Sequence, residues 1–239
     1  SDGTEVQRFD RPSFYGEIEN SWDIAVRPDG SMVATGFAAP DSSDPSTRDI
    51  ALARYNADGT VDTTGFGSHG ETAIDVAGDY DFSYAIDLQA DGKVVAAGFA
   101  TIGGQLDLAL VRLEEDGTAD TGFGTAGVVT LDFFGYDDRA RDVLVLDDGT
   151  LLVAGTRTAA DGVTAEFIVA RFEGNGTLDT GFGTGGVAAV DFGVGNAGAV
   201  VLALAPTGRI VAAGFVEPVA GDHSSRDFAV ARLHPDGSL

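Results

Sequence analysis

Short apolar runs separated by glycine-containing turns follow one another along the chain. A first kind of run mixes apolar with polar positions and leads into a turn with a central Asp-Gly or Thr-Gly pair. A second kind, which follows that turn, is apolar on both faces. An Asp-Gly pair between two such runs predicts a β-hairpin, because glycine takes positive φ at no steric cost. The first runs are residues 22–26, 84–88, 141–145 and 200–204, and the second runs are residues 32–36, 94–98, 151–155 and 210–214.

Two further runs complete a repeating unit. The third run opens a phrase, Asp-Leu-Ala-Leu-Val-Arg-Leu-x-x-Asp-Gly-Thr-x-Asp-Thr-Gly-Phe-Gly, whose copies begin at Asp49, Asp107, Glu166 and, cut short, Asp227. The intervals are 58, 59 and 61 residues, and a period of this size predicts one supersecondary unit used several times. The fourth runs are residues 71–76, 128–133 and 187–192. No segment has a sustained helical period, so we expect no helix longer than one turn.

These runs predict an all-β fold, a four-bladed β-propeller with four antiparallel strands per blade. We expect a single domain over residues 1–239, with blades at roughly 21–76, 84–133, 141–192 and 200–239. The last unit lacks a fourth run, and residues 4–9 form an extra run before the first unit. This N-terminal strand is therefore predicted to complete the last blade, which would remove two unpaired ends. An open solenoid is the alternative, although the sequence has no atypical capping unit.

With these phrases laid out, the chain resembles the bacterial delta-60 repeat family. The matching elements are the stretches at residues 28–36, 53–59 and 64–67, which recur in order along the chain. The strand order also resembles that of NHL-type propellers. The resemblance implies that the first run of each unit lines a central channel and that the protein is extracellular or in the cell envelope. It implies no reaction. Thr207 departs from the pattern, because it replaces the hairpin Asp of the fourth unit.

The composition limits the classes of partner that the protein can bind. The formal net charge is −24, which repels nucleic acid phosphates and anionic lipid surfaces and favours cations or basic partners. A solubility adaptation, to salt for example, explains the same charge. No apolar run approaches the roughly 20 residues that span a bilayer, so we expect no membrane insertion. The chain has no cysteine, which excludes disulfides and thiolate metal sites.

Two features repeat in and beside the connectors between the third and fourth runs. One Phe in each connector (Phe66, Phe123 and Phe182) is expected to pack in the core. In the first three units, the Arg of the third run is followed eight residues later by an Asp, which predicts an ion pair that staples the connector within its blade. The pairs are Arg54 with Asp62, Arg112 with Asp120, and Arg171 with Asp179. The Asp-Gly turns of the connectors partly match a calcium loop, but they also fit Asx turns that bond to their own backbone.

Positions that differ between blades are more informative about function. Two sets of loops are predicted to share one face, which we call the variable-loop face; they are residues 14–21, 77–83, 134–140 and 193–199, and residues 38–48, 100–106, 156–165 and 216–226. Binding usually resides in loops on a rigid scaffold. The first runs begin with Trp22, Tyr84, Arg141 and Val200. We expect Trp22, Tyr84 and Arg141 to bind a ligand by stacking, unless they only plug the channel.

Acidic residues are expected on the same face: Glu17, Glu19, Asp23, Asp79, Asp81, Asp137, Asp138 and Asp142. Asp23 and Asp142 occupy equivalent positions in the first and third units, so they are candidate ligands of a calcium ion in the channel mouth. A solvated acidic rim is the other interpretation. The three histidines share no blade position, and no Ser-His-Asp arrangement, nucleophile elbow, Walker loop or HExxH stretch is present.

The sequence therefore predicts a non-catalytic binding or structural module, expected to be a monomer. Its partner, a protein or a carbohydrate, would dock on the variable-loop face. No catalytic residue is assigned, and calcium is the one cofactor considered. The alternative is a calcium-dependent propeller hydrolase or lactonase in which Asn20 joins Asp23 and Asp142 around a cation.

Overall fold

The computed structural model describes residues 19–39, 47–193, 195–219 and 222–239. In these residues the chain forms fifteen β-strands and a single 3₁₀ turn, η1 (His223–Ser225). The strands are β1 (Glu19–Val26), β2 (Met32–Ala38), β3 (Asp49–Tyr55), β4 (Glu71–Ile74), β5 (Asp81–Leu88), β6 (Val94–Ile102), β7 (Gln105–Leu113), β8 (Val128–Leu131), β9 (Asp138–Val145), β10 (Leu151–Thr158), β11 (Ala165–Phe172), β12 (Val187–Val190), β13 (Asn196–Leu204), β14 (Ile210–Glu217) and β15 (Asp227–Leu233).

Each repeating unit forms one antiparallel sheet with its strands in sequence order. Blades 1, 2 and 3 are the sheets β1–β4, β5–β8 and β9–β12, and blade 4 is the sheet β13–β15. This confirms the predicted fold class, an all-β propeller with four blades. The predicted closing strand, residues 4–9, lies outside the described residues.

The hydrophobic core lies between the blades, because both faces of each second and third strand are apolar. Three clusters each join one pair of consecutive blades. The connector phenylalanines Phe66, Phe123 and Phe182 are fully buried, one in each cluster, which confirms their predicted core role. A fourth, smaller cluster packs Phe37 and Phe82 with other aromatic residues between blades 1 and 2.

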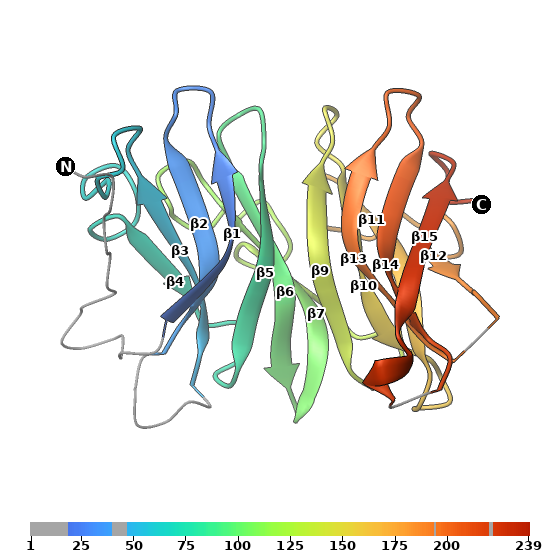
Figure 1. The fold of residues 1–239 in the computed structure, drawn as a ribbon. Coiled ribbons are helices and arrows are strands. Elements are labelled where there is room, and N and C mark those ends of the chain that lie inside the picture. Colours follow the sequence, from blue (N-terminus) through green and yellow to red (C-terminus); the bar gives the residue numbers. More distant parts are fainter. Residues whose placement is uncertain (1–18, 40–46, 194, 220–221) are drawn as a thin grey trace.

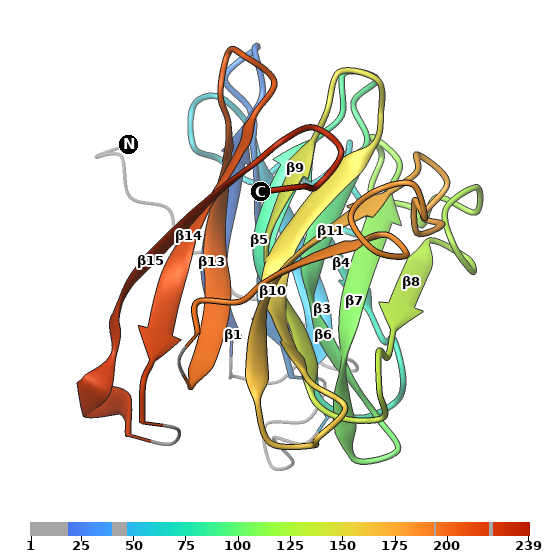
Figure 2. The ribbon, with the colours of Figure 1, turned by 90° about the vertical axis from the view of Figure 1, so that its right-hand side faces the viewer.

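The four blades stand side by side in a row (Figure 1). Strands β1–β4 lie at one end of the row and β13–β15 at the other, and among the described residues the large core clusters join only consecutive blades. The first strands β1, β5, β9 and β13 contact one another in that order. Among the described residues, β15 is the edge strand of blade 4 (Figure 2).

The hairpin turns and the connectors lie at the upper end of the blades in Figure 1, and the fully described loops of the variable-loop face, residues 77–83, 100–106, 134–140 and 156–165, lie at the lower end. This arrangement follows from the antiparallel order, because each blade enters its first strand from the lower end. None of the helical structure in the described residues is long and apolar enough to span a membrane.

Candidate functional site

A β-bulge sits at the same place in every first strand. The register skips one residue at Trp22, Tyr84, Arg141 and Val200, so each of these residues has no direct partner on the second strand. A bulge re-aims one side chain and sharpens the local twist, and bulges are common beside functional sites. The four positions singled out by sequence variation are therefore four equivalent bulged positions.

A glycine opposite each bulge makes it possible. Gly36, Gly98, Gly155 and Gly214 end the apolar core of the second strands. A methyl group on Gly98 would lie 1.7 Å from the carbonyl oxygen of Phe82, far inside van der Waals contact. The glycine at the end of each second run was the sequence signal for the bulge, and sequence reasoning did not use it.

The structure brings Trp22, Tyr84 and Arg141 together. The Arg141 guanidinium carbon lies 4.1 Å from the centroid of the Tyr84 ring, within cation–π distance. The Tyr84 ring meets the Trp22 ring edge to face, with centroids 5.8 Å apart, and Phe82 packs beneath both. The Trp22 side chain is 58% exposed. We call these three residues the ladder; Val200, the fourth bulged residue, is exposed but has no aromatic or charged group.

Asp23 and Asp142 act as clamps between blades. One oxygen of Asp23 accepts a hydrogen bond from the Ile24 amide and the other from the Ile86 amide of blade 2. Asp142 likewise accepts from the amides of Val143 and, in blade 4, Leu202. Both carboxylates therefore already have partners on both oxygens, and their use as calcium ligands stays a prediction.

The third clamp does not occupy the equivalent position. Asp87 lies two residues further along its strand than Asp142 does in blade 3, and it accepts from the Leu88 amide and from the Val145 amide of blade 3. Burial, together with the negative charges of Asp23 and Asp87, raises the pKa of Asp142 to about 6, despite its two amide donors.

An open cleft of about 720 Å³ lies against β1, β5 and β9, on the hairpin side of the ladder. Its lining includes the clamps Asp23 and Asp87 and the exposed carboxylates Asp29 and Glu115. Arg27 crosses this lining and donates to Glu115 and to the Gly92 carbonyl. The lining therefore combines carboxylates with apolar side chains. Its first residue, Asp23, directly follows Trp22 in the sequence.

The predicted solvated acidic rim is wrong for two residues. Asp81 and Asp138 are completely buried. Burial raises the pKa of Asp81 to about 7 and that of Asp138 to about 6. Backbone amides near each carboxylate lower its pKa, but burial has the larger effect. Sequence reasoning counted these residues as rim carboxylates because the packing of the neighbouring blade is not visible in a local pattern.

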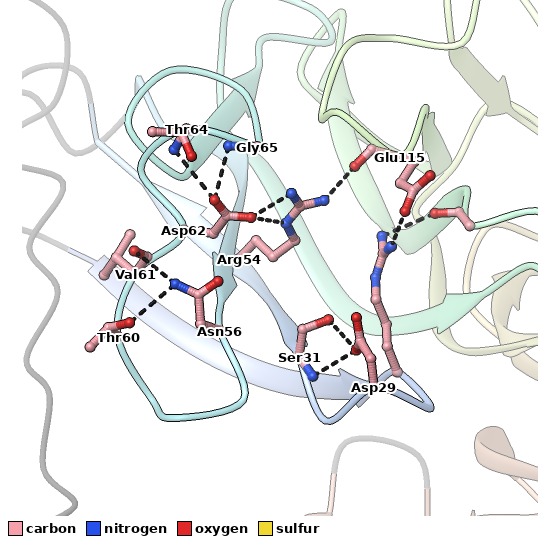
Figure 3. Close-up of polar contacts among 12 residues, drawn as sticks. Asp29, Ser31, Arg54, Asn56, Thr60, Val61, Asp62, Thr64, Gly65 and Glu115 are labelled. Carbon is pink, nitrogen blue, oxygen red and sulfur yellow. Dashed lines mark hydrogen bonds and ion pairs between the residues drawn. The ribbon is translucent and has the colours of Figure 1, made fainter.

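The predicted Arg–Asp staples are present in the first three blades. Arg54 Nε donates to Asp62 Oδ2 at 2.8 Å, and Arg54 Nη2 donates to the same oxygen. The other Asp62 oxygen accepts from the amides of Thr64 and Gly65, which holds the connector (Figure 3). The remaining Arg54 nitrogen donates to the Glu115 carbonyl of blade 2, so the staple, which was predicted to stay within one blade, also joins two blades.

The second staple is the most buried. Arg112 Nε donates to Asp120 Oδ2 at 2.7 Å, and Lys93 donates to the same oxygen. Burial acts to raise the pKa of Asp120, but hydrogen bonds from Lys93, the Gly122 amide and Arg112 lower it to about 2. Arg112 also reaches the Gly174 carbonyl of blade 3. Blade 4 has no matching Asp, and Arg232 is exposed.

The connector turns are Asx turns. The Asp58 carboxylate accepts from the amide and hydroxyl of Thr60, and Asp116 and Asn175 repeat the pattern in the next two connectors. The hairpin residue Asp29 does the same with Ser31 (Figure 3). Since these oxygens bond to their own backbone, the connectors have a structural explanation that needs no ion.

Comparison with known proteins identifies the repeats. Residues 27–64, 89–123, 146–182 and 205–239 match a family described as a domain of unknown function (DUF5122) β-propeller. Each matched segment covers the second and third strands of one blade and the turns that flank them, which confirms that the repeats are those of a β-propeller family. The narrower resemblance to the delta-60 and NHL-type repeats stays a prediction. No curated protein sequence matches the chain.

Several solved structures are similar in fold. Sqt1 from Chaetomium thermophilum is 14% identical with a TM-score of 0.40, and the match covers 86% of this chain and 43% of that one. A GH43 β-1,3-galactosidase with galactodeoxynojirimycin is 10% identical with a TM-score of 0.42, covering 89% and 71%. A GH32 β-fructofuranosidase from Bombyx mori is 9% identical with a TM-score of 0.42, covering 94% and 48%. This chain thus spans less than half the length of Sqt1, and TM-scores this low support no inference about function.

Proposed function

The chain belongs to the DUF5122 β-propeller family, and we propose that it is a non-catalytic binding module whose partner, a carbohydrate or a protein, docks over Trp22, Tyr84 and Arg141. The extracellular or cell-envelope setting that we propose for it rests on the resemblance to the delta-60 repeats alone.

The observation that carries this proposal is the ladder itself. Three equivalent bulges on adjacent blades present an indole, a phenol ring and a guanidinium in one line. Arg141 covers one face of Tyr84, while the Trp22 ring is more than half exposed. An exposed indole beside a fixed polar group is the kind of anchor that dominates recognition surfaces.

The cleft beside the ladder supports the same proposal. A ligand stacked on Trp22 would extend into the space lined by Asp29 and Glu115, whose carboxylates can accept hydrogen bonds from hydroxyl or ammonium groups. Neutral sugars and basic peptide segments both offer such donors, and a sugar ring also offers an apolar face to stack on the indole. An acidic polysaccharide or nucleic acid is disfavoured by the charge of −24.

The test uses the fact that Trp22 is the one tryptophan in the sequence. Its fluorescence therefore reports the ladder directly. We expect a neutral oligosaccharide from a glycan panel to shift the emission, and Trp22→Leu or Arg141→Ala to weaken binding at least tenfold in titration calorimetry. Glu173→Gln, at an exposed connector position at the opposite end of blade 3, is the control and should bind normally.

Other results would change the proposed partner or refute the proposal. Binding of a basic peptide with the same variant profile would assign the ladder to a protein partner. Turnover of a glycoside or lactone that requires calcium and Asp142 would favour the hydrolase alternative. Ligand binding that Trp22→Leu leaves intact would show that the ladder is packing between blades.

A further inference from the structure

The junction between blades 1 and 2 gathers three carboxylates that no role described above uses. Asp49 begins β3, Asp75 follows β4 and Asp81 begins β5. One oxygen from each residue lies within 4.8 Å of an oxygen from each of the other two. Their burial differs: Asp81 is completely buried, Asp49 is partly buried and Asp75 is exposed, so the group opens to solvent at Asp75.

The Asp81 carboxylate lacks one partner. Its Oδ2 accepts from the Val76 amide at 2.6 Å, but its Oδ1 is buried and accepts no hydrogen bond. The Thr101 amide, on the facing strand, lies near the Asp81 carboxylate and lowers its pKa, but its hydrogen bond, 3.1 Å long, goes to the Tyr80 carbonyl. A buried carboxylate oxygen without a donor is costly, and this one belongs to the carboxylate that closes the inner side of the acidic group.

No cationic side chain in the described part of the chain offsets these charges. Among the described residues, none of the three carboxylates lies within ion-pair distance of a Lys, Arg or His side chain. Burial and the Asp75 charge raise the pKa of Asp49 to about 6, which reflects the same crowding. The group is therefore either protonated or neutralised by something outside the part of the chain that the structure describes.

The junction between blades 3 and 4 is a contrast within the same chain. There Glu166 stands in the place of Asp49, and Arg157 Nε donates to it at 2.6 Å. Ala197, which has no polar side chain, stands in the place of Asp81, and the preceding residue Asn196 accepts from the Ala165 amide. That junction carries its own cation and one carboxylate fewer. The junction between blades 2 and 3 keeps three acids, Asp107, Asp132 and Asp138, but both oxygens of Asp138 accept amide hydrogen bonds.

We propose that Asp49, Asp75 and Asp81 bind a calcium ion at the junction between blades 1 and 2. Calcium takes six to eight oxygen ligands at about 2.3–2.6 Å, so two oxygens on one ion can lie as much as about 5 Å apart, as these do. Three carboxylates supply the charge, and water entering beside Asp75 completes the shell. The ion would fasten β3 and β4 of blade 1 to β5 of blade 2.

The experiment is calcium binding to the whole chain, independent of any ladder ligand. After treatment with EDTA, calorimetric titration with CaCl₂ should show a saturable site, and calcium at a hundredfold excess over Kd should raise the unfolding temperature by about 5–10 °C. Asp81→Asn and Asp49→Asn should each lose this response, while Asp147→Asn, an exposed control, should keep it. Having two variants guards against one that fails to fold.

Three outcomes would overturn the proposal. One is a wild-type protein that neither binds calcium nor gains stability from it. Another is a folded Asp81→Asn protein with an unchanged calcium response. The third is a response that disappears in Asp142→Asn and persists in Asp81→Asn, which would place the ion at the channel mouth instead.

A second, independent inference comes from the two ends of the row of blades. Each junction repeats one cluster, in which two residues of a third strand pack on one residue of the next blade's first strand. The sets are Ile50 and Leu52 with Ile86, Leu108 and Leu110 with Val143, and Phe167 and Val169 with Leu202; all are buried. At the two ends of the row, the equivalent side chains are exposed. On β15 of blade 4, Phe228 is 98% exposed and Val230 62%, and on β1 of blade 1, Ile24 is 50% exposed.

We infer that, in a protein consisting of residues 1–239, blade 4 of one copy packs on blade 1 of a second copy. The two bare faces are the two halves of the interface that the chain already builds three times, so each end is complementary to the other. Two copies joined at both ends would form a two-fold ring of eight blades, within the range known for propellers. This departs from the monomer expected from sequence, because that expectation assumed closure within one chain.

Because the chain has no cysteine, an introduced cysteine is the only thiol that can be cross-linked. Differently tagged Ile24→Cys and Phe228→Cys proteins, once mixed, should form a mixed dimer with a short bis-maleimide, and ultracentrifugation should show twice the mass of one chain. Phe228→Asp should give a monomer, whereas Val163→Asp, an exposed loop control, should not. A wild-type monomer at all concentrations, or cross-linking within a single Ile24→Cys/Phe228→Cys chain, would overturn the inference.

Discussion

Replacing Asp81 with Asn removes a buried negative charge and changes almost nothing in shape. The Asn oxygen can still accept from the Val76 amide, and its NH₂ group occupies the place of the oxygen that has no donor. The substitution also removes one of three carboxylates that lie close together. Without calcium, we therefore expect Asp81→Asn to be more stable than the wild type at pH 8.

The magnitude follows from the pKa. The pKa of Asp81 rises from 3.8 to about 7 on folding, mainly through burial. Between these values the folded protein holds a proton that the unfolded chain has released, so wild-type stability falls as the pH rises through this window. At pH 8 the loss amounts to as much as about 4 kcal/mol, whereas below pH 3.8 both states are protonated and the loss vanishes.

The assay is urea unfolding of both proteins in EDTA at pH 4, 6 and 8. The difference between Asp81→Asn and the wild type should grow with pH, and calcium should remove most of it by stabilising the wild type. Asp147→Asn should track the wild type within about 0.5 kcal/mol at every pH. A variant that is destabilised at pH 8, or whose gain is equal at all three pH values, would refute the reasoning.

The remaining predictions concern the repeat itself. Arg112→Ala should lower the free energy of unfolding by about 3–5 kcal/mol, because it leaves Asp120 buried with one cation fewer and strips a donor from the Gly174 carbonyl; unchanged stability in urea would count against the staple. The pKa of Asp120 lies below its ordinary value, so its contribution is present above about pH 4 and lost as the pH falls through about 2; Asp120→Asn should flatten acid unfolding in that range. Gly98→Ala should cost about 1–3 kcal/mol or more, because the new methyl group collides with the Phe82 carbonyl, whereas Gly103→Asn, at φ +61° in open space, should be nearly neutral by thermal unfolding.

The strands, hairpins and staples could be predicted because each depends on residues close together in sequence. An Asp-Gly turn, an apolar run and an Arg eight residues before an Asp all act within one unit. The bulge at Tyr84 was also within reach, since Gly98 lies across the same hairpin. The ladder was anticipated as a set of variable positions, but the stacking of Arg141 on Tyr84 joins two units and depends on how the blades meet.

The acidic junction was out of reach for a different reason. Asp49, Asp75 and Asp81 come from three strands or strand ends and meet only when blade 2 packs on blade 1. In the sequence, Asp81 is one of many acidic residues and has nothing to distinguish it from Asp79. Burial by the neighbouring blade is what turns a solvated carboxylate into one whose pKa rises to about 7.

By itself, the sequence determined the period, the β-strands and the turn chemistry, because hydrogen bonding and steric limits on the backbone act over a few residues. Only the tertiary structure decided which of the many carboxylates are solvated, which are clamped and which lack partners, and which copies of the repeated apolar face remain bare. Those properties depend on what the next blade brings into contact, and desolvation and packing are set by neighbours that lie about 60 residues away in the chain.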